Sequence, residues 1–212
     1  MNEGRPPRPP DPAEVAPQTF FDYHRTVIGF HGTKRSIAKR LVAGDPFGPS
    51  TNDDDWLGHG IYFWEYAPQK AWWWAKRRYG SNAAVVGATI RLGRCLDLLD
   101  PVNTRLLKAG HDEIQATFAA LGAKPPRNAN THKYLDCAVF NLVYAKLGKR
   151  GYGVESTRAV FVPFLGGKLP RMWTRSGVFE DSHIQLCIRE PANILAVWSV
   201  KKDGRYGTDE EA

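Results

Sequence analysis

A histidine followed by a glycine, in the segment His31-Gly32-Thr33, ends an apolar stretch with the pattern of a β-strand. An imidazole at the end of a strand can offer a nitrogen to a hydroxyl group, and a glycine beside it leaves the backbone bare enough to reach an amide. The segment therefore predicts contacts to a polar ligand, although a histidine in an ordinary strand-to-helix turn has the same pattern.

Two glycines, Gly58 and Gly60, lead into the short apolar strand Ile61-Tyr62-Phe63, and a helix with three consecutive tryptophans, 72–74, follows. Neighbouring residues on a helix are about 100° apart, so three adjacent indoles cannot all face one core. At least one is expected to line a cleft, where a flat aromatic side chain suits a planar ligand ring. A helix packed on several sides is the alternative.

Polar side chains alternate with apolar ones near the end of the chain, where His183 and Gln185 share one face of a predicted strand. Alternation of this kind divides a strand between a core and a cleft, or between a core and solvent. Two common site motifs are missing from the sequence. Without Gly-x-x-x-x-Gly-Lys-Ser/Thr the chain is not a P-loop NTPase, and without His-Glu-x-x-His it does not belong to the zinc hydrolases that carry that motif.

The hydrophobic periods predict the elements that must hold these residues. A proline-rich arm over 1–18, flexible or extended as polyproline, precedes one domain over 19–200, and a polar tail follows over 201–212. A polar loop with the acidic run 53–55 covers 45–57. Strands are expected over 26–31, 60–63, 83–92 (continuing at 95–99), 159–164, 182–189 and 194–200, and helices over 34–43, 68–79, 103–121 and 131–147. Helices inserted between strands predict an α+β fold.

Composition limits the class of protein. The 212 residues are 42% hydrophobic and 24% charged, as in ordinary soluble domains, and no apolar run approaches a membrane span. The three cysteines are widely spaced, which predicts neither a disulfide framework nor a zinc site. Because the start of the sequence also lacks an apolar leader, we expect a cytoplasmic protein without a membrane partner. The net charge of +7 and the pI near 9.4 suit an anionic partner, or a solvated basic surface.

Four segments in this order carry a resemblance to a known family. The segments 31–33, 58–63, 71–73 and 183–189 resemble the ADP-ribosyltransferases, on the branch similar to poly(ADP-ribose) polymerases and diphtheria toxin. The resemblance extends over roughly residues 26–200, and its most specific part is Gly-x-Gly-Ile-Tyr-Phe. It implies a split, twisted β-sheet with NAD in its cleft as a co-substrate and no metal.

The resemblance also implies roles for individual residues. His31 would hydrogen-bond the adenosine ribose, the Gly32 backbone would hold the nicotinamide amide, and Tyr62 would pack on the nicotinamide ring. Trp73 falls where the family commonly has a second stacking aromatic, and the loop over 45–57 would cover the donor. The residues expected to contact NAD are His31, Gly32, Thr33, Gly60, Tyr62 and Trp73.

One position departs from the family pattern. The family usually has a glutamate at the start of the last catalytic strand, where it stabilises an oxocarbenium-like transition state, and here Gln185 falls there. An amide can accept a hydrogen bond but carries no full negative charge, and losing one such group typically costs a few kcal/mol of transition-state stabilisation. The expected catalytic residues are thus His31, Tyr62 and Gln185. A nearby carboxylate could replace the missing one: Glu180, Asp181 or Glu155.

The expected function is mono-ADP-ribosyl transfer from NAD to a macromolecular acceptor. The basic charge favours RNA or DNA over protein as the acceptor. Small members that resemble this chain are often toxins or anti-phage effectors, which makes an inhibitory antitoxin protein a further expected partner. Two alternatives remain open: an inactive module that binds NAD, ADP-ribose or nucleic acid, and an RNA 2′-phosphotransferase of the same wider fold.

Overall fold

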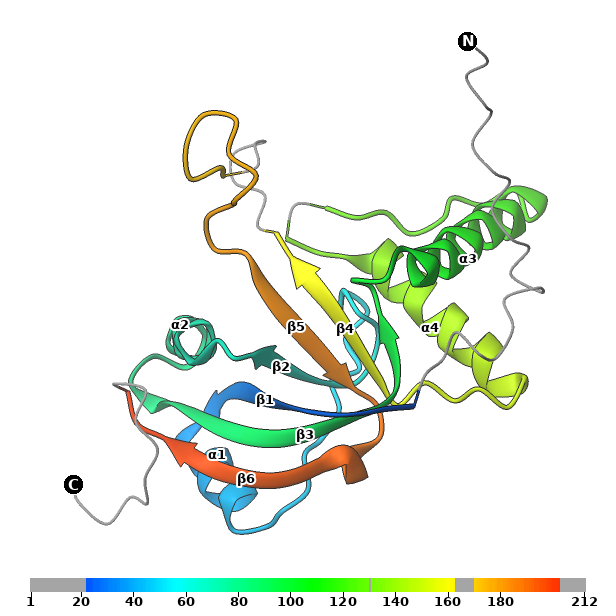
Figure 1. Cartoon of the computed structure of the whole chain (residues 1–212). Helices are drawn as coiled ribbons and strands as arrows, with labels where there is room; N and C mark the ends of the chain where they lie inside the picture. Colours follow the sequence, from blue (N-terminus) through cyan, green and yellow to red (C-terminus); the bar gives the residue numbers. More distant parts are fainter. Residues whose placement is uncertain (1–21, 130, 163–169, 203–212) are drawn as a thin grey trace.

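The computed structural model describes residues 22–129, 131–162 and 170–202. The expected proline-rich arm over 1–18 and all but two residues of the expected tail lie outside these ranges. Within them, a six-stranded mixed sheet is combined with four α-helices (Figure 1), and the α+β prediction is confirmed. In this part of the chain no helix has both the length and the apolar character needed to cross a membrane.

The order of elements follows the sequence prediction closely. The strands are β1 (Asp22–Lys34), β2 (Ile61–Glu65), β3 (Ala83–Asp97), β4 (Ser156–Phe161), β5 (His183–Ile188) and β6 (Ile194–Val200), and the helices are α1 (Arg35–Val42), α2 (Pro68–Tyr79), α3 (Pro101–Ala120) and α4 (Tyr134–Lys149). Several boundaries differ by three or four residues: β1 begins at Asp22 and not at 26, and β4 spans Ser156–Phe161 and not 159–164. The expected interruption between 92 and 95 is absent, because β3 continues without a break through Gly93. That glycine has a φ of +58°, which suits a residue without a side chain, and the strand beyond it pairs with β4.

The strand pairings close on themselves. The sheet runs in the order β1-β2-β5-β4-β3-β6, and β3 also pairs along nearly its whole length with β1. Five strands therefore form a ring of pairings, and β6 extends it from β3. All neighbours are antiparallel except β3 and β4. A ring of this kind leaves few strand edges with unpaired backbone groups, which favours one register of strand pairing over the alternatives.

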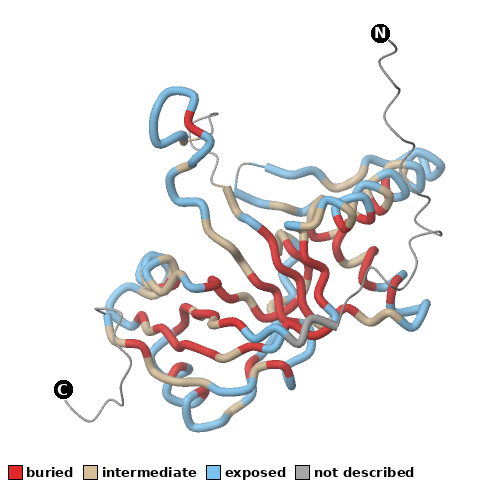
Figure 2. The backbone as a smooth tube through the Cα atoms, in the orientation of Figure 1, coloured by how far each residue is buried: buried red, intermediate tan, exposed pale blue. Residues whose placement is uncertain are grey.

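Successive side chains along a strand point to opposite faces and pack in separate hydrophobic clusters. Ile61 and Phe63 of β2 join a cluster with α1, whereas Tyr62 between them packs against the cluster under α3 and α4. A third cluster lies between α2 and the strands β1, β3 and β6. Figure 2 shows the buried backbone concentrated in the crossing strands and the exposed backbone in the outer turns of the helices and in the segment before β5.

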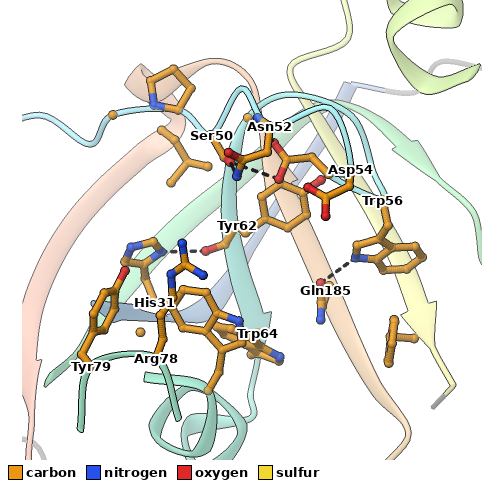
Figure 3. Close-up of a pocket in the computed structure, with 18 residues that line it drawn as sticks. His31, Ser50, Asn52, Asp54, Trp56, Tyr62, Trp64, Arg78, Tyr79 and Gln185 are labelled. Carbon is orange, nitrogen blue, oxygen red and sulfur yellow. Dashed lines mark hydrogen bonds between the residues drawn. The ribbon is translucent and has the colours of Figure 1, made fainter. Parts of the chain in front are cut away.

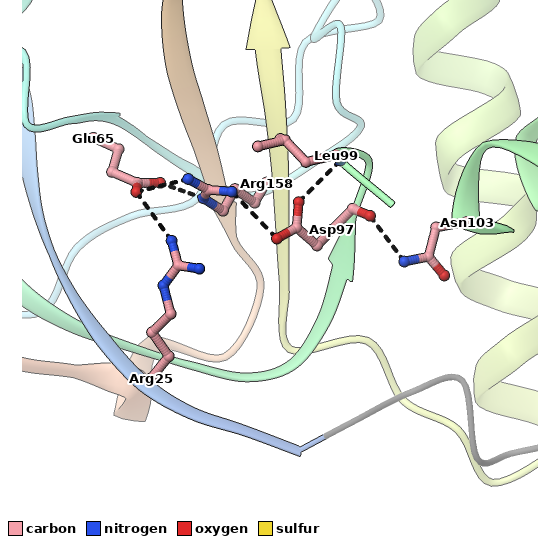
Figure 4. A network of polar contacts seen from close by, with 6 residues as sticks. All are labelled: Arg25, Glu65, Asp97, Leu99, Asn103 and Arg158. Carbon is pink, nitrogen blue, oxygen red and sulfur yellow. Dashed lines mark hydrogen bonds and ion pairs between the residues drawn. The ribbon is translucent and has the colours of Figure 1, made fainter. Parts of the chain in front are cut away.

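A buried ionic network joins three strands of the ring (Figure 4). Arg158 on β4 donates from Nε and Nη2 to the two carboxylate oxygens of Glu65 on β2, at 2.6 and 3.0 Å, and from Nη1 to Asp97 on β3 at 3.3 Å. All three residues are less than 9% exposed. Arg25 on β1 also donates to Glu65, from Nη2 to Oε1 at 3.5 Å.

The network also reaches the start of α3. The Asp97 side chain accepts a hydrogen bond from the Leu99 backbone nitrogen. The backbone carbonyl oxygen of Asp97 accepts one from the Asn103 side chain at 2.8 Å. Taking charged groups out of water is costly, so a buried guanidinium stabilises the fold only while its carboxylates remain paired. The strand ring and the helical layer therefore depend on one arginine.

Replacing Arg158 with methionine, which has a similar volume, should lower the free energy of unfolding by about 3–5 kcal/mol, because Asp97 would be buried without a cation and Glu65 would keep only its longer contact with Arg25. Urea denaturation at neutral pH measures the loss. The double variant Glu65→Leu/Arg158→Met should recover part of it. Arg40→Ala, which removes an exposed ion pair with Asp45, is the control. If Arg158→Met is as stable as this control, the buried network contributes little to stability.

Candidate functional site

The candidate site lies where two neighbouring strands separate. β1 and β2 pair at two positions only, and the last of these joins Phe30 to Trp64. Beyond it β1 keeps β3 as its partner, whereas the part of β2 before Trp64 pairs with β5. The strands therefore part at His31, and a cavity of about 470 Å³ lies there, lined by residues of both strands, of β5 and of α2 (Figure 3).

The His31 side chain links the two separated strands. Its Nδ1 lies 2.8 Å from the carbonyl oxygen of Tyr62. A carbonyl oxygen only accepts, so Nδ1 carries the proton and Nε2 of the neutral ring is an acceptor. Burial lowers the pKa of His31 below its ordinary value of 6.5, although the bond to Tyr62 acts in the opposite direction. The cavity therefore has a neutral imidazole whose free lone pair can accept from a hydroxyl group.

The Tyr62 ring is fixed by the end of the loop that precedes β2. Its hydroxyl donates to the carbonyl oxygen of Gly58 at 2.7 Å and accepts from the backbone nitrogen of Leu57 at 2.9 Å. Burial raises the pKa of Tyr62 well above its ordinary value, so the phenol stays protonated. With the hydroxyl engaged, the ring itself is the part of Tyr62 available to a ligand.

The two glycines expected to contact the ligand line the cavity, and each also permits a close approach of backbone. A Cβ on Gly32 would lie 2.6 Å from the carbonyl oxygen of Ala71, where α2 crosses β1. A Cβ on Gly60 would lie 2.9 Å from the carbonyl oxygen of Ile188 on β5. Any larger residue would push these elements apart. Packing alone therefore requires glycine at both positions, and the bare backbone at Gly32 faces the cavity.

Gln185 on β5 lines the opposite wall and is held by a chain of hydrogen bonds. Trp56 Nε1 donates to Gln185 Oε1 at 2.7 Å, and Gln185 Nε2 lies 3.1 Å from His183 Nε2. His183 Nδ1 lies 2.7 Å from the carbonyl oxygen of Asp181, so Nδ1 carries the proton and Nε2 accepts from the amide. Burial lowers the pKa of His183, which keeps this arrangement neutral. The chain orients the oxygen of Gln185 toward Trp56.

None of the three carboxylates proposed to replace the missing one lines the cavity. Glu155 forms an ion pair with Arg94 and also accepts from the Arg94 backbone. Asp181 forms an ion pair with Lys70 at 2.6 Å, and Glu180 lies on the exposed segment before β5. Glu180 and Asp181 precede the first residue of β5, whereas Gln185 lies within the strand, and Glu155 lies directly before β4.

The carboxylates that do line the cavity come from the acidic run in the polar loop. Asp55 accepts from the Ser50 hydroxyl and from the Asn52 backbone, each at 3.0 Å, and burial raises the pKa of Asp55 against these bonds. Asp54 lies beside it, with Oδ2 2.6 Å from His132 Nδ1. The sequence marked this run as part of a loop over the ligand, but nothing in it assigned a role to either carboxylate.

The structure places Trp73, the expected stacking aromatic, outside the cavity lining. Trp73 is 60% exposed, and Trp74 lines the cavity in its place. The reason is the phase of the helix: Ala71 and Ala75, both fully buried, turn α2 toward β1. Trp73 is two residues from each alanine, about 200° around the helix, and therefore points away from the sheet. Thr33 is also displaced, because it is 4% exposed and does not line the cavity.

Several lining residues were not predicted from the sequence. Trp64 follows Tyr62 at the strand period of two, so alternation could have identified it. Its ring centre lies 5.7 Å from that of Trp74, and Tyr79 packs edge-on against Trp74 at 5.8 Å. Arg78 lies over the Trp74 ring at 5.7 Å and brings a cation to the cavity. Only the phase of α2 reveals these contacts, and that phase depends on tertiary packing.

The arrangement suits a ligand with several chemical parts. The indole of Trp74 can flank a flat ring, His31 can accept from a hydroxyl, and Arg78 can bind an anionic group. Asp54 and Asp55 can stabilise positive charge. In the described ranges no group of three or more histidine, cysteine, aspartate or glutamate side chains is placed to hold a metal ion.

Comparisons with known proteins give one partial match. The chain is 35% identical over 66 residues to an uncharacterized protein, MJ0359, of the archaeon Methanocaldococcus jannaschii. The match covers 29% of this chain and 31% of that protein, so the chain spans less than a third of its relative. No family model matches the sequence, and no solved structure matches either.

The neutral form of His31 can be tested by nuclear magnetic resonance. We expect the ring to carry its proton on Nδ1 and to titrate below pH 6.5, because burial disfavours the imidazolium ion. Long-range ¹⁵N–¹H correlation spectra read both properties. The unfolded chain binds this proton near pH 6.5 and the folded chain only at lower pH, so the stability contributed by the neutral ring is lost as the pH falls through 6.5.

A matched variant separates His31 from other groups. His31→Asn should reduce the loss of stability between neutral and mildly acidic pH, whereas the contribution of His183, whose pKa is also lowered, should persist. A positively charged ring at pH 7 would contradict the lowered pKa of His31, and a neutral ring with its proton on Nε2 would contradict the hydrogen bond to Tyr62.

Proposed function

We propose that the protein is a mono-ADP-ribosyltransferase, which cleaves NAD and transfers ADP-ribose to a macromolecular acceptor. One observation carries the proposal: His31, Tyr62 and Gln185, from three different strands, line a single cavity. Those are the three positions that the family resemblance selects as catalytic. The separation of β1 from β2 at this cavity supports the corresponding split-sheet fold as part of the same proposal.

The cavity offers a partner for each chemical group of NAD. Its volume of about 470 Å³ lies in the usual range for small-molecule pockets, roughly 300–1,000 Å³. Tyr62 and Trp74 would flank the nicotinamide ring, and the Gly32 backbone would bind its carboxamide. His31 Nε2 would accept from a ribose hydroxyl, and Arg78 would pair with the pyrophosphate. In this arrangement Trp74 takes the stacking role that the resemblance gave to Trp73.

The reaction needs a site that stabilises positive charge on the ribose. The bond from C1′ to the nicotinamide nitrogen breaks, and its electron pair leaves with nicotinamide. C1′ becomes oxocarbenium-like until a nucleophile on the acceptor bonds to it and loses a proton. The Gln185 oxygen supplies a dipole, and Asp54 and Asp55 supply negative charge from the facing loop. Groups oriented in advance toward the developing charge lower the barrier most.

The remaining features agree with an intracellular enzyme that acts on an anionic acceptor. All three cysteines are free and buried, as expected in a reducing compartment. The net charge of +7 favours RNA or DNA as the acceptor. A role as a toxin or anti-phage effector, restrained by an antitoxin protein, belongs to the same proposal and follows from the resemblance.

The purified protein should release nicotinamide from NAD, and both His31→Ala and Tyr62→Ala should reduce the rate at least about 100-fold, because each removes a group that orients the reacting bond. Liquid chromatography of nicotinamide gives the rate. Lys149→Gln, at an exposed position on α4, serves as the matched control. If no acceptor supports release although NAD binds by calorimetry, the chain is a binding module.

Gln185→Glu should raise the rate of NAD hydrolysis roughly tenfold or more, because the new carboxylate can still accept from Trp56 and adds a full negative charge at the reacting ribose. Nicotinamide release in the absence of acceptor measures the change. An unchanged rate in this variant, together with a fall in Asp55→Asn, would instead assign the charge to the loop.

A further inference from the structure

The outer face of α2 combines an exposed aromatic ring with positive charge. Trp73 is 60% exposed, and two cations lie over its ring: Lys70 Nζ at 6.0 Å and Arg77 Cζ at 5.6 Å from the ring centre. These contacts hold the indole in a fixed position on the surface. A large aromatic side chain that packing does not bury offers a ready surface for a second flat ring.

The charge that α2 itself carries has a single sign, and the carboxylate of Asp181, from the segment before β5, pairs with Lys70 at its edge. α2 carries four basic residues and no acidic one, and Lys76, Arg77 and Arg78 are all exposed. Basic residues in the last turn stabilise a helix through its dipole, which accounts for part of this pattern. The dipole does not account for Trp73, which lies in the middle of the helix and is surrounded by the same charges.

The exposed face is continuous with the cavity. Trp74 and Arg78 line the cavity, and each follows by one residue a member of the outer face, Trp73 or Arg77. One residue is a rotation of about 100° around the helix. A single helix thus presents one pair of aromatic and cationic side chains to the cavity and a second pair to solvent beside it.

We propose that the outer face of α2 binds single-stranded nucleic acid. An unpaired base stacks on Trp73, and the flanking phosphates pair with Arg77 and Lys76. Aromatic platforms within a basic surface bind single strands in this way, with little preference for sequence. An acidic peptide would match the charge but would leave the indole unused, and the paired bases of a duplex have no free face to stack on it.

The binding surface stands on the geometry of α2 alone. Its use as the acceptor site rests on the proposed function, because a strand held by Trp73 would place neighbouring nucleotides at the rim of the cavity. The two ideas can therefore fail separately, and the test below measures binding in the absence of NAD.

Fluorescence anisotropy with labelled oligothymidylate and oligouridylate of about 16 nucleotides, the upper end of a usual site size, tests the surface on the full chain. Trp73→Leu should weaken binding about fivefold or more, and Trp73→Phe should retain most of it, because only an aromatic ring provides a stacking face. Arg77→Gln should reduce the slope of log K against log salt by about 0.7, the value for one phosphate on a single strand.

Matched controls decide the outcome. Lys149→Gln, which removes an exposed charge on α4, should leave the effect of salt and the preference for single strands unchanged, and all variants should melt near the wild-type temperature. Binding that is insensitive to both Trp73→Leu and Arg77→Gln would overturn the proposal. So would equal affinity for a duplex of the same length, or full competition by polyglutamate. Strand binding without nicotinamide release would leave this surface intact and remove the proposed enzyme.

Discussion

The parting of β1 and β2 at His31 is the constraint on which the cavity depends. Once β1 leaves β2, the Tyr62 carbonyl loses the strand neighbour that would normally satisfy it, and a buried polar group without a partner is costly. The His31 imidazole takes that place at 2.8 Å. On the other side, α2 crosses Gly32 too closely for any side chain. The gap between the strands is thus held by one side-chain hydrogen bond and one glycine contact.

The sequence was sufficient for most of the local structure and for much of the site. The apolar period predicted α2 over 68–79 with both ends correct, and strand alternation predicted that His183 and Gln185 share a face. The family resemblance predicted that His31 and Tyr62 contact one ligand, and both line one cavity, although their roles stay a prediction. The predictions of α2 and of the shared face on β5 succeed because each depends on spacing within a single element, which tertiary contacts do not change.

Other features depend on contacts between distant segments and have no local signal. Trp73 and Trp74 are identical in type, and only the burial of two alanines against β1 decides which indole meets the cavity. The sequence predicted a strand at 95–99, but not that this part of β3 pairs with β4. The pairing of Glu65 with Arg158 joins residues 93 positions apart, and either residue alone has the sequence pattern of a surface charge. Tertiary packing therefore determines the phase of α2, the pairing of β3 with β4 and the pairing of Glu65 with Arg158.

The placement of charge around the cavity follows from the same packing. β5 presents a neutral amide at the position where a carboxylate was expected, and its oxygen is already engaged by Trp56. Trp56 belongs to the loop that carries Asp54 and Asp55, so the hydrogen bond that orients Gln185 also holds two acidic residues over the cavity. Arg78 enters from α2 on the other side. Opposite charges thus enter the cavity from different elements, an arrangement that suits the proposed reaction, in which an anionic donor binds at one end and a cationic ribose is stabilised at the other.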